Sequence, residues 1–268
     1  MKIIIAIICS ILMTVTLNAQ KLIYIRPLSS MKLNNSFYPG AYFKSPLDVA
    51  GNEYYSFYNY GLHANTTQLN LGLSVGLKLS NLSAFEFSVA SDNASIKSAF
   101  VYKTPNYSSS LIGRSLVRIS ADYHRLLYTN KLFDLRGTVG FGLFLTPKQN
   151  NDTNTIDIFE SNFSASVVRT VFNYNRISPL LKLGTGLDFK TKMGKPFCSL
   201  DVFLTYNLGK PLLSESYNVT VTDNAQQIST FQHTLSSKGS GINFQLSFPF
   251  QVYSFRTKKV INLSAFDE

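Results

Sequence analysis

The sequence has no tryptophan, three histidines and two cysteines, and only 15% of its 268 residues are charged. A typical soluble domain has about 25% charged residues, so this composition argues against an ordinary cytosolic enzyme. The hydrophobic share of 45% and the aromatic share of 13% exclude a disordered chain. The length suits one domain that buries a sizeable core or closes a sheet on itself.

Residues 1–19 have the pattern of a secretory signal peptide. A lysine follows the first methionine, residues 3–13 are almost wholly apolar, and Ala19 ends an acceptable cleavage signal. The apolar run is too short for a membrane-spanning helix, which needs about 20 residues. We therefore expect cleavage after Ala19, which removes Cys9 and leaves Cys198 without a partner for an internal disulfide.

After residue 19 no apolar run reaches 18 residues, which excludes a transmembrane helix. Instead, eight segments alternate between apolar and polar residues. In residues 69–80 every odd position is Leu or Val, and every even position is Asn, Gly, Ser or Lys. This period of two is typical of β-strands. The predicted strands cover residues 23–31, 69–80, 85–92, 117–124, 133–145, 181–189, 199–206 and 242–251.

The polar faces of these strands contain mainly Gly, Ser, Thr and Asn, with a few charges of both signs. Such faces suit the interior of a small closed barrel whose apolar outside contacts lipid, because closure leaves no unpaired backbone edge. We predict an all-β fold, a closed antiparallel up-and-down transmembrane β-barrel of eight strands. A soluble β-sandwich is one alternative, and a ten-stranded barrel in which residues 53–66 pair as strands is another.

The connections between the predicted strands alternate in length. Long connections cover residues 33–66, 93–114, 147–176 and 210–238, whereas short turns lie near Asn81 and at 128–131 and 191–196. Outer-membrane barrels combine long outer loops with short periplasmic turns in this way. We therefore assign residues 20–255 to the barrel domain and residues 256–268 to a periplasmic tail.

Lysine and arginine residues concentrate near the short turns, for example at Lys190, Lys192 and Lys195. They are not interleaved with stacking aromatic residues, so nucleic-acid binding is not expected. Contact with anionic phospholipid headgroups explains them better.

Ionisable residues on the polar faces are predicted to form a network of ion pairs in the barrel lumen. His124 lies beside Asp122, and a histidine next to a carboxylate is one half of a catalytic triad. Ion pairs commonly fill small barrels, however, so a structural role is favoured. No residues have metal-ligand or nucleotide-binding spacing, so we predict no catalytic residue, no metal and no cofactor. The alternative is a lipid-modifying hydrolase that uses His124 or His233. The predicted network comprises Lys78, Glu86, Arg118, Asp122, His124, Asp134, Arg136, Lys182, Asp188 and Asp201.

The first long connection is dense in tyrosine, which is typical of recognition surfaces. Packing of these rings against the barrel wall or its mouth is an equal alternative. The candidate recognition residues are Tyr38, Tyr42, Tyr54, Tyr55, Tyr58 and Tyr60.

The signal-peptide end Asn18-Ala19-Gln20, the alternation from Leu69 and the sorted connections together resemble the small outer-membrane β-barrel proteins of Gram-negative bacteria. The Ala-Gln junction and the Asn-, Lys- and Ile-rich composition are similar to the Bacteroidetes versions. Members commonly end on an aromatic residue, whereas here Phe255 is followed by residues 256–268.

The resemblance implies a cell-outer-membrane location, with membrane lipids and the barrel-assembly machinery as partners. We expect a non-enzymatic protein whose surface loops serve adhesion, interaction with an unidentified ligand or envelope integrity. A lipid-modifying hydrolase and a narrow porin-like channel are the alternatives.

Overall fold

The computed structural model describes residues 22–36, 43–44, 55–59, 62–64, 69–102, 106–160, 163–223 and 228–254. The predicted signal peptide and the predicted tail at 256–268 lie outside these residues. Within them, no helix has the length and apolar character needed to cross a membrane.

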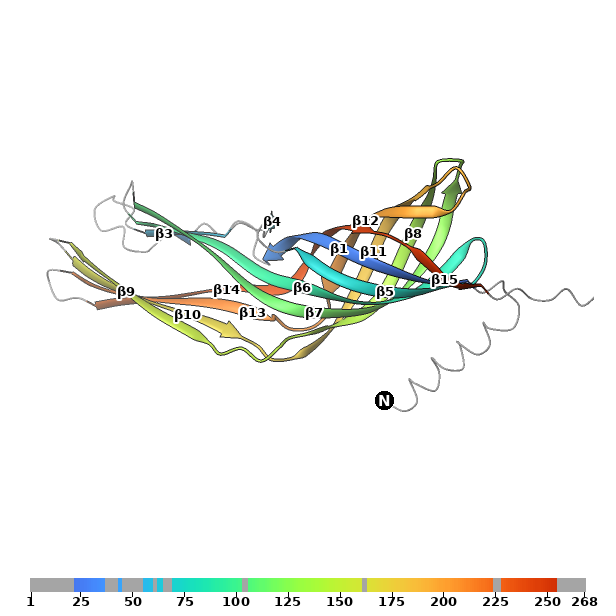
Figure 1. Cartoon of the computed structure of the whole chain (residues 1–268). Coiled ribbons are helices and arrows are strands. Elements are labelled where there is room, and N and C mark those ends of the chain that lie inside the picture. Colours follow the sequence, from blue (N-terminus) through green and yellow to red (C-terminus); the bar gives the residue numbers. More distant parts are fainter. Residues whose placement is uncertain are drawn as a thin grey trace, which may run out of the picture.

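Eight antiparallel strands form a closed ring, because the last of them pairs back with the first (Figure 1). This confirms the predicted eight-stranded barrel. The ten-stranded alternative is wrong, because β3 (Tyr55–Asn59) and β4 (Leu62–Ala64) pair with the ends of ring strands without entering the ring. The ring strands are β1 (Leu22–Ser36), β5 (Asn70–Lys78), β6 (Ser83–Tyr102), β7 (Asn106–Thr129), β8 (Phe133–Leu145), β11 (Ile177–Lys190), β12 (Pro196–Asn207) and β14 (Ile228–Ser247).

Alternation places apolar side chains outside the ring and polar ones inside it. In β5 the outward Leu71, Leu73 and Val75 are 47–60% exposed, while the inward Ser74 is 1% exposed. A soluble sandwich buries its apolar faces, so that alternative is wrong for the barrel. Other exposed apolar side chains on ring strands are Val89, Val139, Phe141, Leu183, Leu200, Val202, Leu204, Phe244 and Leu246.

Tight turns connect the strands at one end of the barrel, which we call the turn end. In the turn after β7, the Asn130 Oδ1 accepts the backbone N–H groups of Leu132 and Phe133 at 2.7 and 2.8 Å. In the turn after β11, Thr191 N–H donates to the Lys195 carbonyl at 2.8 Å, and Gly194 has φ +74°. Glycine adopts this left-handed conformation without the steric penalty of a side chain.

The long connections at the other end, the loop end, contain strands that the alternation did not predict. We call them the distal layers, and in Figure 1 they extend to the left of the barrel. The first consists of β2 (Phe43–Lys44), β3 and the outer parts of β6 and β7. The second has the order β14-β13-β10-β9, with β9 (Asp152–Glu160), β10 (Phe163–Asn173) and β13 (Leu213–Asp223).

An apolar core lies where the two distal layers meet the barrel and covers the loop end of the lumen. It includes Leu116, Phe144 and Leu212, each at most 2% exposed. Gly239 (φ +73°) lies where β14 passes from its distal partner β13 to its ring partners, and a Cβ there would lie 3.2 Å from Leu116. The rest of the core is formed by Ala94, Ile96, Val171, Leu180, Leu213 and Leu235.

Replacing Gly76 by Ala is expected to destabilise the barrel, because the new Cβ would lie 1.9 Å from Cζ of Tyr24. The ring would have to move from its hydrogen bond with Glu86, and overpacking of this kind costs about 1–3 kcal/mol. The measurement is the temperature at which the folded band disappears on a detergent gel. Gly137→Ala is the matched control, because its Cβ would meet its nearest neighbour at an ordinary 3.4 Å. Equal melting of the two variants would contradict the assigned packing.

Candidate functional site

Among the described residues, five cationic side chains and five carboxylates form ion pairs in the barrel lumen. Ion pairs connect them across the ring, and most of these side chains are less than 10% exposed. Because a buried charge is costly without a partner, this balance is a condition for filling the lumen with polar groups. The set is Arg26, Lys32, Arg118, Arg136 and Lys182 with Glu86, Asp92, Asp122, Asp188 and Asp201.

Arg136 organises the part of the lumen near the turn end. Its Nε donates to Asp188 at 3.1 Å and its Nη2 to Asp201 at 2.6 Å. Its Nη1 lies 2.8 Å from Nδ1 of His124. One guanidinium on β8 thus connects side chains from β7, β11 and β12, as its fork of five donors allows.

The middle of the lumen combines an ion pair with an aromatic ring. Lys182 Nζ donates to Asp122 Oδ2 at 2.7 Å. The same ammonium lies 4.2 Å from the centroid of the Phe203 ring, and the Arg118 guanidinium lies 5.0 Å from it. Phe203 points inward on β12, where Gly184 on β11 makes room, since a Cβ there would lie 2.4 Å from that of Phe203. The ring thus contacts two cations at once.

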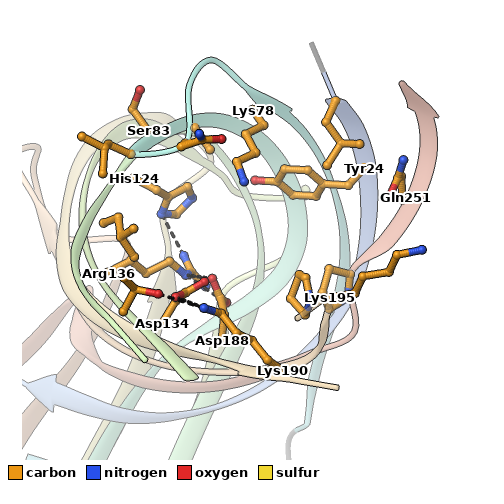
Figure 2. A pocket seen from close by; sticks show the side chains of 18 of the residues that line it. Tyr24, Lys78, Ser83, His124, Asp134, Arg136, Asp188, Lys190, Lys195 and Gln251 are labelled. Atoms are coloured by element: carbon orange, nitrogen blue, oxygen red, sulfur yellow. Dashed lines mark hydrogen bonds and ion pairs between the residues drawn. The ribbon is translucent and has the colours of Figure 1, made fainter. Parts of the chain in front are cut away.

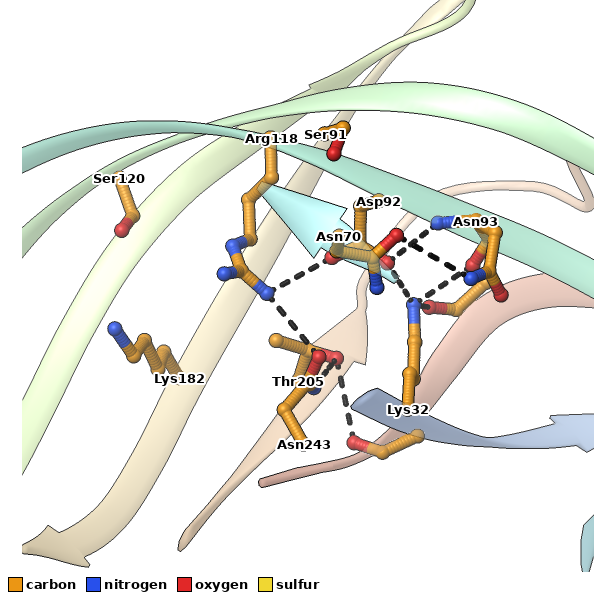
Figure 3. A network of polar contacts seen from close by, with 12 residues as sticks. Lys32, Asn70, Ser91, Asp92, Asn93, Arg118, Ser120, Lys182, Thr205 and Asn243 are labelled. Carbon is orange, nitrogen blue, oxygen red and sulfur yellow. Dashed lines mark hydrogen bonds and ion pairs between the residues drawn. The ribbon is translucent and has the colours of Figure 1, made fainter. Parts of the chain in front are cut away.

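Asp92 is the centre of the third cluster, near the loop end (Figure 3). Its two oxygens accept hydrogen bonds from Lys32 at 2.6 Å and from Arg118 at 2.8 Å. Lys32 also donates to the carbonyls of Asn93 and Gly239, at 2.9 and 2.6 Å. All three donor positions of this ammonium are therefore used, and the cluster joins β1, β6, β7 and β14.

The structure brings eight of the ten predicted network residues into these clusters. Asp134 instead pairs with Lys190 at 2.5 Å near the turn end. Lys78 lines the turn-end mouth and has no ion pair with any described residue.

Sequence analysis missed Arg26, Lys32 and Asp92 as members of the network. Arg26 and Asp92 lie in predicted strands, and Lys32 lies one residue beyond one. All three have the spacing of the inward face, so extending the first predicted strand by one residue would have found Lys32.

Glu86, Asp122 and His124 form a group that the sequence did not indicate as a metal site. One potential ligand atom from each lies within 4.8 Å of the others. However, Arg26 lies 3.5 Å from Glu86, Lys182 donates to Asp122, and Arg136 contacts His124. These cations already balance the carboxylates, so a metal ion would have to displace them, and we interpret the group as part of the ion-pair network.

The two histidines considered for catalysis lie in different parts of the molecule. His124 is inside the barrel, where its Nδ1 lies 2.8 Å from Thr138 Oγ1 as well as from Arg136. His233 is on the distal part of β14, opposite Tyr217 of β13. Burial lowers the pKa of His233 despite the opposing effect of Glu215. The structure therefore does not combine the two histidines into one site.

Most of the tyrosines predicted for recognition lie outside the described residues. Tyr38, Tyr42, Tyr54 and Tyr60 lie outside the described residues, and only the backbone of Tyr55 and Tyr58 is described, in β3. They stay a prediction.

The turn end of the lumen opens into a cavity of about 670 Å³. Figure 2 shows Tyr24, Lys78, His124, Arg136 and Asp188 around its wall. The turns after β5 and β11 and the first residues of β1 form its rim. At the loop end, by contrast, the apolar core covers the lumen. The cavity is thus a one-sided mouth above the Arg136 cluster.

No protein-family model matches the sequence, and no curated protein matches it. Among solved structures, the fold is similar to the outer membrane protein OprG from Pseudomonas aeruginosa, with 10% identity, TM-score 0.41 and coverage of 87% of this chain and 97% of that chain. The outer membrane protease OmpT from Escherichia coli has 8% identity and TM-score 0.23, with coverage of 88% and 96%.

The transport unit of the Escherichia coli autotransporter AIDA-I has 8% identity and TM-score 0.23, with coverage of 90% and 92%. These identities and scores are too low to carry any activity over to this chain, whose fold assignment rests on its own strand pairing.

Replacing Lys182 by Met is expected to destabilise the folded barrel by about 3–5 kcal/mol, because it leaves the fully buried Asp122 without its cation. The double variant Lys182→Met with Asp122→Leu should recover most of this loss. The measurement is the fraction of compact protein on an unheated gel after incubation in increasing urea. Arg125→Gln, at an exposed position on the same strand as Asp122, should behave as the wild type. No recovery in the double variant would contradict a charge-balance role.

Proposed function

We propose that the chain is an integral outer-membrane protein without enzymatic activity, in which a sealed barrel anchors the two distal layers outside the membrane. The observation that carries this proposal is the inverted surface of the barrel, apolar outside and ionic inside. In water, this arrangement would expose a broad apolar area and bury ten charges. In a bilayer, the apolar outside contacts lipid, and the closed ring keeps the paired charges away from the lipid.

The length of the apolar surface fits a membrane. Transmembrane strands need about 9–11 residues, and β5 and β12 have 9 and 12. The dense apolar surface ends where the distal layers begin, and among the described residues of those layers only Leu111 and Ile228 are large, apolar and exposed. There the strands present residues such as Thr153, Asn154, Thr155, Thr230 and Gln232, all exposed. This boundary supports an orientation with the turn end in the periplasm and the distal layers outside the cell.

The filled lumen supports an anchoring role over the porin-like alternative. Three ionic clusters and an apolar core follow one another along the barrel axis, and eight-stranded barrels have interiors that side chains just fill.

The distal layers are the part that suits adhesion, interaction or envelope integrity. Hydrogen bonds to a carboxylate connect β10 and β13 of the second layer. The Arg169 Nε and the Tyr217 hydroxyl both donate to Glu215 at 2.6 Å. Burial disfavours the charge of Arg169, but the neighbouring Glu215 raises its pKa overall. A rigid, polar surface of this kind favours a partner outside the cell. We also propose that the barrel-assembly machinery inserts the protein into the membrane.

The membrane assignment is tested by gel electrophoresis of the isolated outer-membrane fraction, with and without boiling. A closed barrel resists the detergent until it is heated, so the unboiled protein should migrate as a more compact band. A soluble secreted protein with no mobility shift would refute the proposal.

Sealing of the lumen is tested by conductance in planar lipid bilayers. The wild type should show no steady ion conductance, because the clusters around Arg136, Lys182 and Asp92 fill the lumen in succession. A variant with Lys32, Asp92 and Arg118 all replaced by Ala should conduct no better, because the Lys182–Asp122 pair and the Arg136 cluster stay in place. Steady openings of the wild type would favour the porin-like alternative.

A further inference from the structure

We propose that the turn-end cavity is a binding site for an anion that bears a phosphate group. This site lies in the mouth of the barrel, apart from the distal layers on which the proposed function depends. Its anion-binding property requires only the folded barrel.

The charges that line the cavity are unbalanced, unlike those deeper in the lumen. Five cationic side chains line it, namely Arg26, Lys78, Arg136, Lys190 and Lys195, against two carboxylates, Asp134 and Asp188. Each carboxylate already has a partner, since Asp134 pairs with Lys190 and Asp188 pairs with Arg136. Arg26 and Arg136 also face Glu86 and Asp201 deeper in the lumen, so Lys78 and Lys195 account for the excess of positive charge where the cavity opens.

Arg26 is the best-placed ligand for an anion. Its side chain is only 5% exposed, and its Nε and Nη1 have no hydrogen-bond partner among the described residues. Its nearest carboxylates are too distant or poorly directed for hydrogen bonds, with Glu86 at 3.5 Å and Asp188 at 3.9 Å. A buried guanidinium with unused donors is costly, and a phosphate accepts two parallel hydrogen bonds from such a fork.

Lys78 and Lys195 supply further positive charge from other sides of the cavity. Lys78 is at the end of β5 and Lys195 in the turn before β12, and Figure 2 shows both at the cavity wall. Neither has an ion pair with a described residue. Arg26, Lys78 and Lys195 therefore come from three different chain segments, and a ligand with several anionic oxygens matches such a set.

The cavity also has an apolar side, which suits a phosphate ester with an apolar body. Leu22, Leu82 and Phe250 contribute to its lining. Next to Phe250 the ring is incompletely paired, because the ladder between β12 and β14 ends at Ser199 and Ser247.

Beyond that point, β15 (Phe250–Ser254) pairs with β1, and no pairing of β15 with β12 is found among the described residues. Pro196 and Pro249, which both line the cavity, lack the N–H groups needed to extend the ladder. The wall is not held together by backbone hydrogen bonds at this place, so it is where an acyl chain of the ligand would leave the cavity.

Isothermal titration calorimetry tests the proposal with the full, folded protein in a nonionic maltoside detergent, which contains no phosphate. The probes are inorganic phosphate, dihexanoyl-phosphatidylglycerol and uncharged dihexanoylglycerol. We expect saturable binding of one equivalent of a phosphate-bearing probe, weakened about tenfold by Lys78→Gln, which removes one charge-assisted contact.

Lys192→Gln is the matched control, because Lys192 is an exposed lysine in the same turn as Lys195 and does not line the cavity. It should leave the affinity unchanged. No saturable binding of either phosphate probe, an equal loss in Lys192→Gln, or equal affinity for the uncharged lipid would each overturn the proposal.

The two phosphate probes distinguish the possible sources of the ligand. Equal affinity for both would identify a soluble phosphate or phosphate ester. An affinity at least tenfold higher for the phosphatidylglycerol would identify a phospholipid headgroup, with its chains leaving where β12 and β15 are not paired. Either result supports the site.

Discussion

The pairing of five cations with five carboxylates inside the barrel is the constraint on which the rest of the structure depends. A ring of eight strands leaves an interior that side chains must fill, and in this chain most of those side chains are polar or charged. Each inward charge needs a partner on another strand, because a lone buried charge is far more costly than a pair. The ion pairs therefore also favour one register, since a slip by one residue would turn the same charges toward lipid.

This constraint explains why the two ends of the barrel differ. At the loop end, Asp92 has two cationic partners, and the apolar core covers the cluster. At the turn end, the pairing is incomplete, because Arg26 retains unused donors and Lys78 has no ion-pair partner among the described residues. The first arrangement seals the lumen and stabilises it. The second leaves a charged mouth, in which the barrel is stable although some cationic groups lack a hydrogen-bond or ion-pair partner.

The barrel could be predicted from sequence because its two faces differ in chemistry at every second residue. In β12, for example, Leu200, Val202 and Leu204 alternate with Ser199, Asp201 and Thr205. The distal strands lack this contrast: in β10, valine and phenylalanine occur on both faces, and Arg169 shares a face with Val167 and Val171. Such strands depend on their neighbours in the sheet, so no local pattern marks them. The partners of each charge were equally hidden, because Arg26 and Glu86 lie on strands that are not adjacent in the ring.

Strand β14 belongs to both parts of the molecule, with its first half in the second distal layer and its second half in the barrel wall. Strands β6 and β7 likewise run from the first distal layer into the ring. A pulling force on the distal layers would therefore act along continuous strands and load many backbone hydrogen bonds in shear at once, not one after another. No flexible linker separates the distal layers from the barrel at these three strands, so the fold can transmit tension from the distal layers to the barrel wall.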